Sequence, residues 1–258
     1  MKQHNGGRSL KTTETSLEVL EAVIDHGGAS ISTLVDELGL SRSTVHNHVS
    51  TLVDHGYLTE DANTYYAGAK FCQIGDHVRK CKPEYVIAGD IVADLAERTE
   101  LDVDFSVEEN GYIISLYNGL RWADNAHFLN SGSFFYVHST ASGKAILAEY
   151  TTDHAEQILE KRGLPELTRH TITSKEAFFE ELERVREQGY AVNEEESLEG
   201  MWSVAKTVHN PMGKVIGTVN LSAPLYLRDP DVQGPAVELL TESVERFEER
   251  LEQKFLEG

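Results

Sequence analysis

The stretch "LSRSTVHNHVSTLVDHGYL", residues 40–58, decides how the first part of the chain is interpreted. Val45, Val49 and Leu52 recur at helical spacing and therefore share one face of a helix. Much of the opposite face consists of side chains that hydrogen-bond but carry almost no charge: Ser43, His46, Asn47 and Ser50. A solvated helix face normally carries Glu and Lys. This face is instead typical of one that exchanges its water for another polar surface.

Two further short helices are predicted before this stretch. The first covers residues 16–25 and places four apolar side chains at helical spacing: Leu17, Leu20, Val23 and Ile24. Ser30 is a natural N-cap for the second, and Gly39 ends it. Three short helices, the last two joined by a glycine-containing turn, predict a helix-turn-helix. Residues 59–71, "TEDANTYYAGAKF", then predict a small β-hairpin, or wing.

From Pro83 onward the pattern changes to strands flanked by helices. Pro83 itself begins a predicted helix. The later segments predict a hairpin at 101–119, a helix at 173–189 opened by a capping box from Thr173 to Glu176, two strands at 201–224 and a long helix at 232–255. The predicted fold class is therefore α+β with an antiparallel sheet in the second domain. The predicted domains are residues 1–72, a linker at 73–82, and residues 83–258.

The composition indicates a globular chain with a large acidic excess. It has 43 acidic and 23 basic residues, a formal charge of −20, which is typical of a protein that stays soluble in concentrated salt. We expect a cytoplasmic protein, because no apolar run long enough for a membrane span or leader peptide occurs. The nine-residue spacing of Cys72 and Cys81 fits neither a disulfide framework nor a zinc knuckle, which leaves a redox role open.

No catalytic motif is found. The chain lacks a GxSxG elbow and an HExxH helix, and "ASGK" at 141–144 is too short for a phosphate-binding loop. His46 and His48 lie two apart on a helix, so they diverge, which is poor metal-ligand geometry. We therefore expect neither an enzyme nor a bound metal or cofactor.

In a helix-turn-helix the second helix enters the DNA major groove. The candidate DNA-contacting residues are Ser30, Ser41, Arg42, Ser43, Thr44, His46, Asn47 and Tyr65. Arg42 suits guanine and Asn47 suits adenine. At ~1 M salt the Debye length is about 3 Å, so such binding would depend on close contacts. The alternative is a winged helix that mediates only protein contacts.

Four blocks resemble the IclR-type transcription regulators: the helix-turn-helix, "VHSTASGKAILA" at 137–148, "GYAVNEEESLEG" at 189–200 and "GTVNLSAP" at 217–224. They come in the family's order and span nearly the whole chain. The resemblance implies a winged helix-turn-helix joined by a linker helix to a GAF-like effector domain. It also implies a homodimer or tetramer on operator DNA and a small-molecule effector, such as a sugar-derived, organic or aromatic acid.

The resemblance also implies an effector site, formed at matching positions by Phe135, Ala141, Ser142, Asn193, Met201, Ser203, Asn220 and Ser222. Trp202 and Phe135 are candidates for its apolar wall. Asn220 and Ser222 could instead face solvent, Lys144 could cap a carboxylate rather than touch an effector, and the Glu194–Glu196 run could be a solvated turn. The predicted function is a ligand-responsive transcription regulator. The alternative is a sensor or interaction module that binds no specific DNA.

Overall fold

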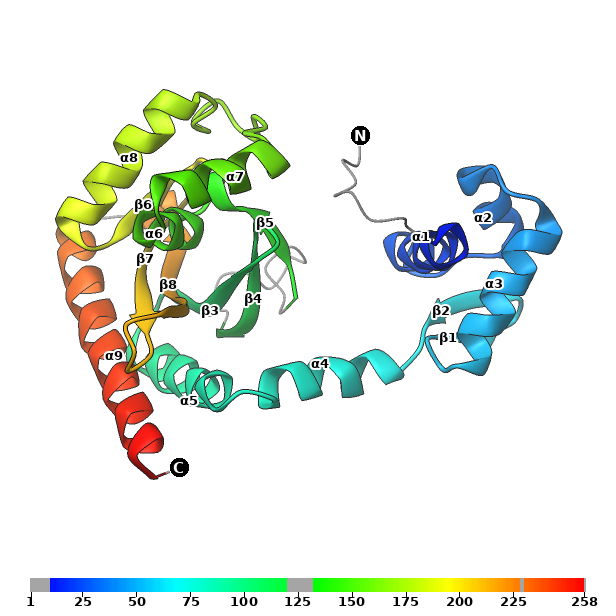
Figure 1. Ribbon diagram of the computed structural model, residues 1–258, viewed down its shortest axis with the longest axis horizontal. Helices are drawn as coiled ribbons and strands as arrows, with labels where there is room; N and C mark the ends of the chain where they lie inside the picture. Colours follow the sequence, from blue (N-terminus) through cyan, green and yellow to red (C-terminus); the bar gives the residue numbers. More distant parts are fainter. Residues whose placement is uncertain (1–9, 120–131, 228–229, 258) are drawn as a thin grey trace. The chain divides into compact units, whose positions relative to one another are not determined.

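The computed structural model describes residues 10–119, 132–227 and 230–257. Two compact units divide the chain, residues 1–81 and 82–258 (Figure 1). Most of the segment predicted as a linker, 73–82, lies in helix α4, Lys70–Lys80, which belongs to the first unit. The predicted functional boundaries, a DNA-binding domain at 1–72 and an effector-binding domain at 83–258, stay a prediction.

No helix within those three ranges is long and apolar enough to cross a membrane.

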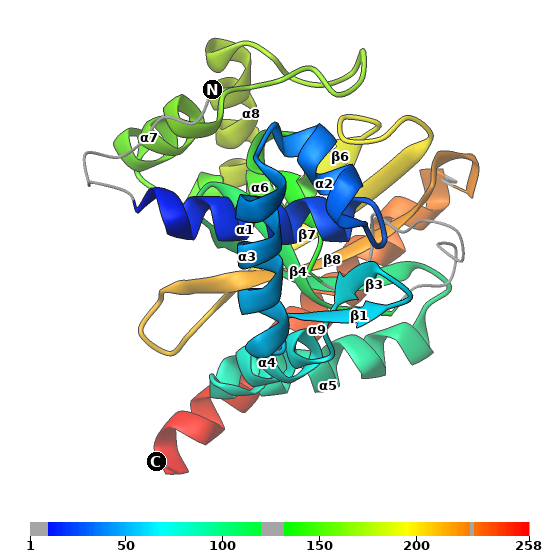
Figure 2. The ribbon, with the colours of Figure 1, turned by 90° about the vertical axis from the view of Figure 1, so that its right-hand side faces the viewer.

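The N-terminal unit contains the predicted helix-turn-helix and wing. Its elements are α1 (Lys11–Asp25), α2 (Ile31–Leu38), α3 (Arg42–Asp54), β1 (Leu58–Asp61), β2 (Thr64–Ala67) and α4 (Figure 2). Ser30 Oγ accepts from the Thr33 amide at 3.2 Å and so caps α2 as predicted. Gly39 ends this helix at φ +64, a left-handed conformation that glycine adopts without strain.

Helix α1 buries only part of the face that was predicted. Leu20 and Val23 are buried as predicted, but Leu17 and Ile24 are 52% and 49% exposed, and Val19 is fully buried instead. Two apolar stripes overlap on this helix, and they share Leu20 and Val23. Periodicity alone could not choose between them, because the choice depends on which stripe meets the core formed by α2 and α3.

The C-terminal unit is built around one antiparallel sheet of six strands in the order β5-β4-β3-β8-β7-β6. The strands are β3 (Asp102–Glu109), β4 (Tyr112–Gly119), β5 (Phe134–Tyr136), β6 (Ala191–Glu194), β7 (Met201–His209) and β8 (Val215–Pro224). The helices are α5 (Pro83–Arg98), η2 (Val137–Ser139), α6 (Ala141–Glu149), α7 (Thr152–Arg162), α8 (Lys175–Gln188), η3 (Leu225–Leu227) and α9 (Pro230–Glu257). The predicted α+β class is confirmed.

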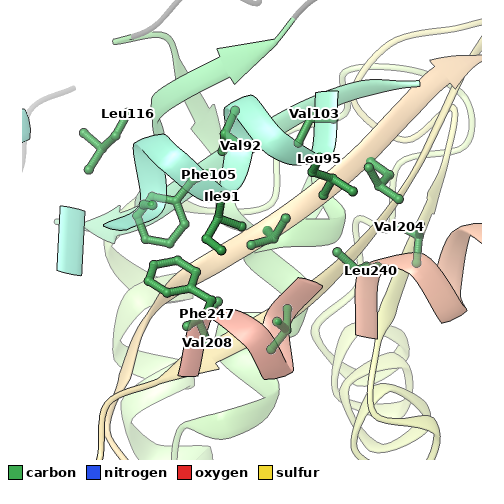
Figure 3. Packing of buried hydrophobic residues seen from close by; sticks show 14 of the residues in the cluster. Ile91, Val92, Leu95, Val103, Phe105, Leu116, Val204, Val208, Leu240 and Phe247 are labelled. Atoms are coloured by element: carbon green, nitrogen blue, oxygen red, sulfur yellow. The ribbon is translucent and has the colours of Figure 1, made fainter. Parts of the chain in front are cut away.

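Helices α5 and α9 pack together against one face of this sheet, and α6 packs against the other (Figure 1). Figure 3 shows the first of these cores, where Phe105 of β3 meets Phe247 of α9 with ring centroids 5.6 Å apart. Burial of such large apolar side chains fixes which face of each strand is directed toward α5 and α9.

Local signals place most turns correctly, with one exception at α8. The predicted hairpin turns at Asn110 and Gly111, whose φ angles of +57 and +82 match the turn expected for Asn-Gly. The capping box predicted from Thr173 to Glu176 is wrong, because Ser174 is the cap and its Oγ accepts from the Ala177 amide at 3.1 Å. Thr173 and Ser174 both carry a hydroxyl that can cap a helix, so the sequence alone does not decide which of them is the N-cap.

Candidate effector cavity and DNA-contacting helix

The sheet face beneath α6 is unusually polar for a surface covered by a helix. Strand β3 alternates, so Val103 and Phe105 enter the core beneath α5 and α9 while the residues between them point the other way. The register of β3 with β8 sets polar residues side by side: Asp102 with Ser222, Asp104 with Asn220, and Ser106 with Thr218. Cross-strand partners share a face. Polar rows therefore cross the sheet where an apolar core would otherwise continue.

A cavity of about 270 Å³ lies over these polar rows. Its lining includes all of the residues predicted for the effector site: Phe135, Ala141, Ser142, Asn193, Met201, Ser203, Asn220 and Ser222. Asn220 is only 7% exposed, so it does not face bulk solvent. Trp202 also borders the cavity, but it belongs to the hydrophobic cluster on the α5 and α9 side.

The beginning of α6 forms one wall of the cavity. Thr140, Ala141 and Ser142 line it, and Thr140 caps the helix by accepting from the Gly143 amide at 3.0 Å. A Cβ added at Gly143 would lie 1.9 Å from the Val137 carbonyl oxygen, so η2 and α6 can pack this closely only with glycine here. The positive end of the helix dipole is thereby held against the cavity.

Asp104 is a cavity residue that sequence reasoning missed. Its Oδ2 accepts from Ser106 Oγ at 2.6 Å, and its Oδ1 accepts from Asn220 Nδ2 at 2.7 Å. Burial is the largest influence on the pKa of Asp104 and raises it to about 6. The charge of Asp102 also raises this pKa, whereas the two hydrogen bonds lower it. The alternation of "DVDFSV" places Asp102, Asp104 and Ser106 on one face of the strand, but by itself it predicts only a hairpin.

Lys144 holds the wall behind the cavity rather than lining it. It is 1% exposed, and its Nζ donates to Glu181 at 3.0 Å and to Glu196 at 2.5 Å. Burial raises the pKa of Glu196. Burial acts the same way on Glu181, but there Lys144 and Arg184 outweigh it and hold the pKa below its usual value. Lys144 thus caps carboxylates, as one of its two predicted roles required.

The acidic run beside Asn193 is not simply a solvated turn. Glu194 is exposed, but Glu196 is buried and its amide donates to Asn193 Oδ1 at 2.9 Å. Asn193 Nδ2 also donates to Ser197 Oγ at 3.0 Å. Asn193 therefore connects the cavity lining to the loop that bears Glu196.

The predicted DNA-contacting residues occupy two kinds of position. Arg42, Ser43, His46 and Asn47 are exposed on α3. Exposed Ser41 caps α3, accepting from the Thr44 amide at 3.1 Å, and half-buried Thr44 is 2.8 Å from it through the hydroxyl oxygens. His48 turns the other way and lies 2.8 Å from Ser16 Oγ of α1.

Ser30 and Tyr65 are half-buried and have structural contacts. Ser30 caps α2. Tyr65 packs against the N-terminal core, and its backbone exchanges hydrogen bonds of 2.8 and 2.9 Å with Ala29. These two residues position the wing and α2, so their side chains are less available than those of Arg42 and Asn47.

The structure also describes the two cysteines and the side chains that could bind a metal ion. Cys72 and Cys81 are free and exposed. Among the described residues, no group of three His, Cys, Asp or Glu side chains is placed to hold a metal ion.

A winged helix-turn-helix with a polar recognition face, followed by a domain with a polar cavity, defines a class of ligand-sensing DNA-binding proteins. Residues 13–62 match the IclR helix-turn-helix domain, and residues 85–246 match the bacterial transcriptional regulator IclR C-terminal domain. The chain belongs to the IclR family of transcription regulators.

Two transcriptional regulators match most of the chain. The chain is 27% identical over 250 residues to a probable HTH-type transcriptional regulator, ArcR, of Halobacterium salinarum, covering 95% of each chain. It is 30% identical over 215 residues to the HTH-type transcriptional regulator KdgR of Escherichia coli, covering 80% of this chain and 79% of KdgR.

Solved structures show the same fold. The Thermotoga maritima IclR structure matches with a TM-score of 0.77 and 23% identity, covering 94% of this chain and 99% of that one. An IclR homologue from Microbacterium hydrocarbonoxydans, complexed with 4-hydroxybenzoate, matches with a TM-score of 0.78 and 20% identity, covering 94% of this chain and 99% of that one.

Proposed function

We propose that this regulator binds operator DNA through the exposed face of α3 and that a small metabolite in the 270 Å³ cavity changes its operator affinity. The observation that carries this proposal is the convergence of the cavity lining. Residues from five separate stretches of chain, including Phe135, Asn193 and Asn220, meet at one site. A concave site that combines polar groups with an apolar wall is typical of small-molecule binding.

The α3 face suits base contacts better than it suits a solvated surface. Arg42 and Asn47 are exposed, and within the described ranges no acidic side chain forms an ion pair with Arg42. Both can bond to base edges with two hydrogen bonds each, Arg42 to guanine and Asn47 to adenine. Ser41 and Thr44 sit at the helix start, where phosphate contacts are common.

We further propose that the regulator acts as a homodimer or tetramer, in the cytoplasm, and by binding rather than by catalysis. Helix-turn-helix proteins read pseudo-palindromic operators with two symmetry-related helices. An effector can then act by changing the relative placement of those helices. Sedimentation at several protein concentrations tests the assembly.

The test of the function is binding of the purified full-length protein to its own upstream DNA in ~1 M KCl. A DNA of the same composition in shuffled order serves as the matched control. Specific binding that one metabolite weakens or strengthens is the expected result. Linkage then requires operator DNA to change the affinity for that metabolite by the same factor. Equal affinity for the metabolite with and without operator would contradict the proposed coupling between effector binding and DNA binding.

A further inference from the structure

The charge of the cavity specifies its ligand more narrowly than the fold does. Among the lining residues that the structure describes there are two acidic side chains, Asp102 and Asp104, and no Lys, Arg or His. The remaining polar groups are neutral hydroxyls and amides. Lys144, one turn further along α6, is engaged by Glu181 and Glu196. The described part of the lining thus carries two acidic side chains and no basic one.

Asp104 is the centre of this negative charge. The two described groups bonded to it, Ser106 and Asn220, are neutral donors, so these hydrogen bonds do not cancel its formal charge. Asp102 lies on the same face of β3, two residues away, and raises the energy of the ionised Asp104 further. A buried carboxylate in this position is stabilised most by a positive charge brought in from outside.

The cavity also has a positive side. The N-terminal residues of α6, Ala141 and Ser142, line it, and a helix start favours a ligand carboxylate or other anionic group. One site therefore offers a place for an anionic group at α6 and a place for a cation at Asp104. A simple dianion such as a dicarboxylate satisfies the first and is repelled by the second.

We propose that the effector of this regulator carries a protonated nitrogen that binds to Asp104, as in an amino-carboxylate whose acid end lies at the start of α6. The proposal rests on the proposed function and narrows its ligand class. Asp104 is then the residue that selects for charge. The organic and aromatic acids without an amine that the family resemblance suggests fit this cavity less well.

Ionisation of Asp104 makes the proposal testable through pH. The described polar residues that line the cavity on the elements around Asp104 are Asp102 on its own strand, Asn220 and Ser222 on β8, Asn118 and Ser115 on β4, and Ser142 on α6. Of these only Asp102 is ionisable. The pKa of Asp104 is about 6. Binding of a cation requires the ionised form, so affinity should be constant above this pH and fall about tenfold per unit below it.

The experiment uses matched pairs of probes that differ in charge but hardly in shape. The pairs are 4-aminobutanoate with 4-hydroxybutanoate, 5-aminopentanoate with 5-hydroxypentanoate, and 4-guanidinobutanoate with 4-ureidobutanoate. Binding to the full-length protein is measured by calorimetry at pH 8 and pH 5. The same measurements are made on Asp104→Asn and on Asp153→Asn, which removes an equal charge from an exposed position of α7.

The proposal expects the member with the protonated nitrogen to bind at least about tenfold more tightly than its partner in at least one pair, a free-energy difference of about 1.4 kcal/mol. Asp104→Asn should abolish that preference, and Asp153→Asn should retain it. Circular dichroism shows whether Asp104→Asn is folded, and the pH dependence of the wild type needs no variant. Members without a protonated nitrogen that bind equally well, or a preference that survives Asp104→Asn, overturn the proposal.

Operator binding by the wild type, measured in parallel without any probe, separates the two proposals. Specific operator binding together with no binding of any probe that carries a protonated nitrogen overturns the charge assignment but leaves the regulator. Absence of operator binding, with or without a bound probe, instead counts against the proposed function.

Discussion

Asp104 is the residue where stability and ligand binding oppose each other. Burial raises its pKa from 3.8 to about 6. A raised carboxyl pKa contributes stability that is fully present below the unfolded value, near pH 3.8, and is lost as pH rises through about 6. In the ligand-free protein the ionised group therefore costs roughly 3 kcal/mol above that pH.

The Asp104→Asn variant should recover most of this cost. We expect its free energy of unfolding to exceed that of the wild type by about 2–3 kcal/mol at pH 8 and by little at pH 4. Urea denaturation at both pH values measures the difference, with Asp153→Asn as the control for loss of an acidic charge. A variant less stable than wild type at pH 8 would show that the two hydrogen bonds to Asp104 outweigh its burial.

On α3, Arg42→Ala and Asn47→Ala should each weaken operator binding by roughly 1–3 kcal/mol if each side chain makes a bidentate base contact. Fluorescence anisotropy with labelled operator measures this, and Met212→Ala, in an exposed turn of the other unit, is the control. Unchanged affinity in both α3 variants would move base recognition to other residues.

At the scale of elements, the contact between η2 and α6 is the tightest packing that a single substitution can test. Alanine is ordinarily better than glycine in a helix by up to about 1 kcal/mol. At Gly143 we expect the opposite sign, a loss of at least about 2 kcal/mol, because the new Cβ would displace the Val137 carbonyl. Thermal unfolding measures both this variant and Gly75→Ala. An added Cβ at Gly75 of α4 meets nothing within 4 Å, so that control should be neutral or stabilising.

The sequence predicted elements best where a local signal was unique. Ser41 and the Val45–Val49 spacing specified α3, and Asn110-Gly111 specified the hairpin of β3 and β4. The buried face of α1 was predicted less well, because both Leu17 and Val19 fit a helical stripe and only tertiary contacts separate them. Family resemblance placed the cavity residues.

Asp104 could not have been found in the same way. Alternation on β3 shows that Asp102, Asp104 and Ser106 share a face, but it does not show which face is covered. That depends on the position of α6, whose chain segment is some forty residues away. A polar strand face is usually exposed to water, so the sequence alone gives no reason to place Asp104 in a cavity.

At the scale of the whole molecule, the formal charge of −20 is the dominant electrostatic feature. Ion pairs such as Arg246–Asp94 and Arg250–Asp90, each 2.6 Å long, join α9 to α5. Both are largely exposed and so contribute little individually. The acidic excess leaves many carboxylates that repel one another, and salt screens this repulsion.

We therefore expect the unfolding free energy to rise between ~0.1 M and ~1 M KCl, as the Debye length falls from about 10 Å to about 3 Å. Salt also changes stability through solvation, and measurements on one protein do not separate that effect from screening. A variant of α9 can separate them, because exposed Glu245, Glu249 and Glu252 lie three and four residues apart and repel one another.

Replacing these three residues with Gln removes repulsion without changing shape. We expect the triple variant to be more stable than the wild type by about 0.5 kcal/mol at ~0.1 M KCl, from pairwise terms of a few tenths each. The advantage should vanish at ~1 M, where screening already removes the repulsion. Solvation effects of KCl cancel in the comparison. An advantage that persists at high salt would show that helix propensity or packing, and not charge, is what the substitutions changed.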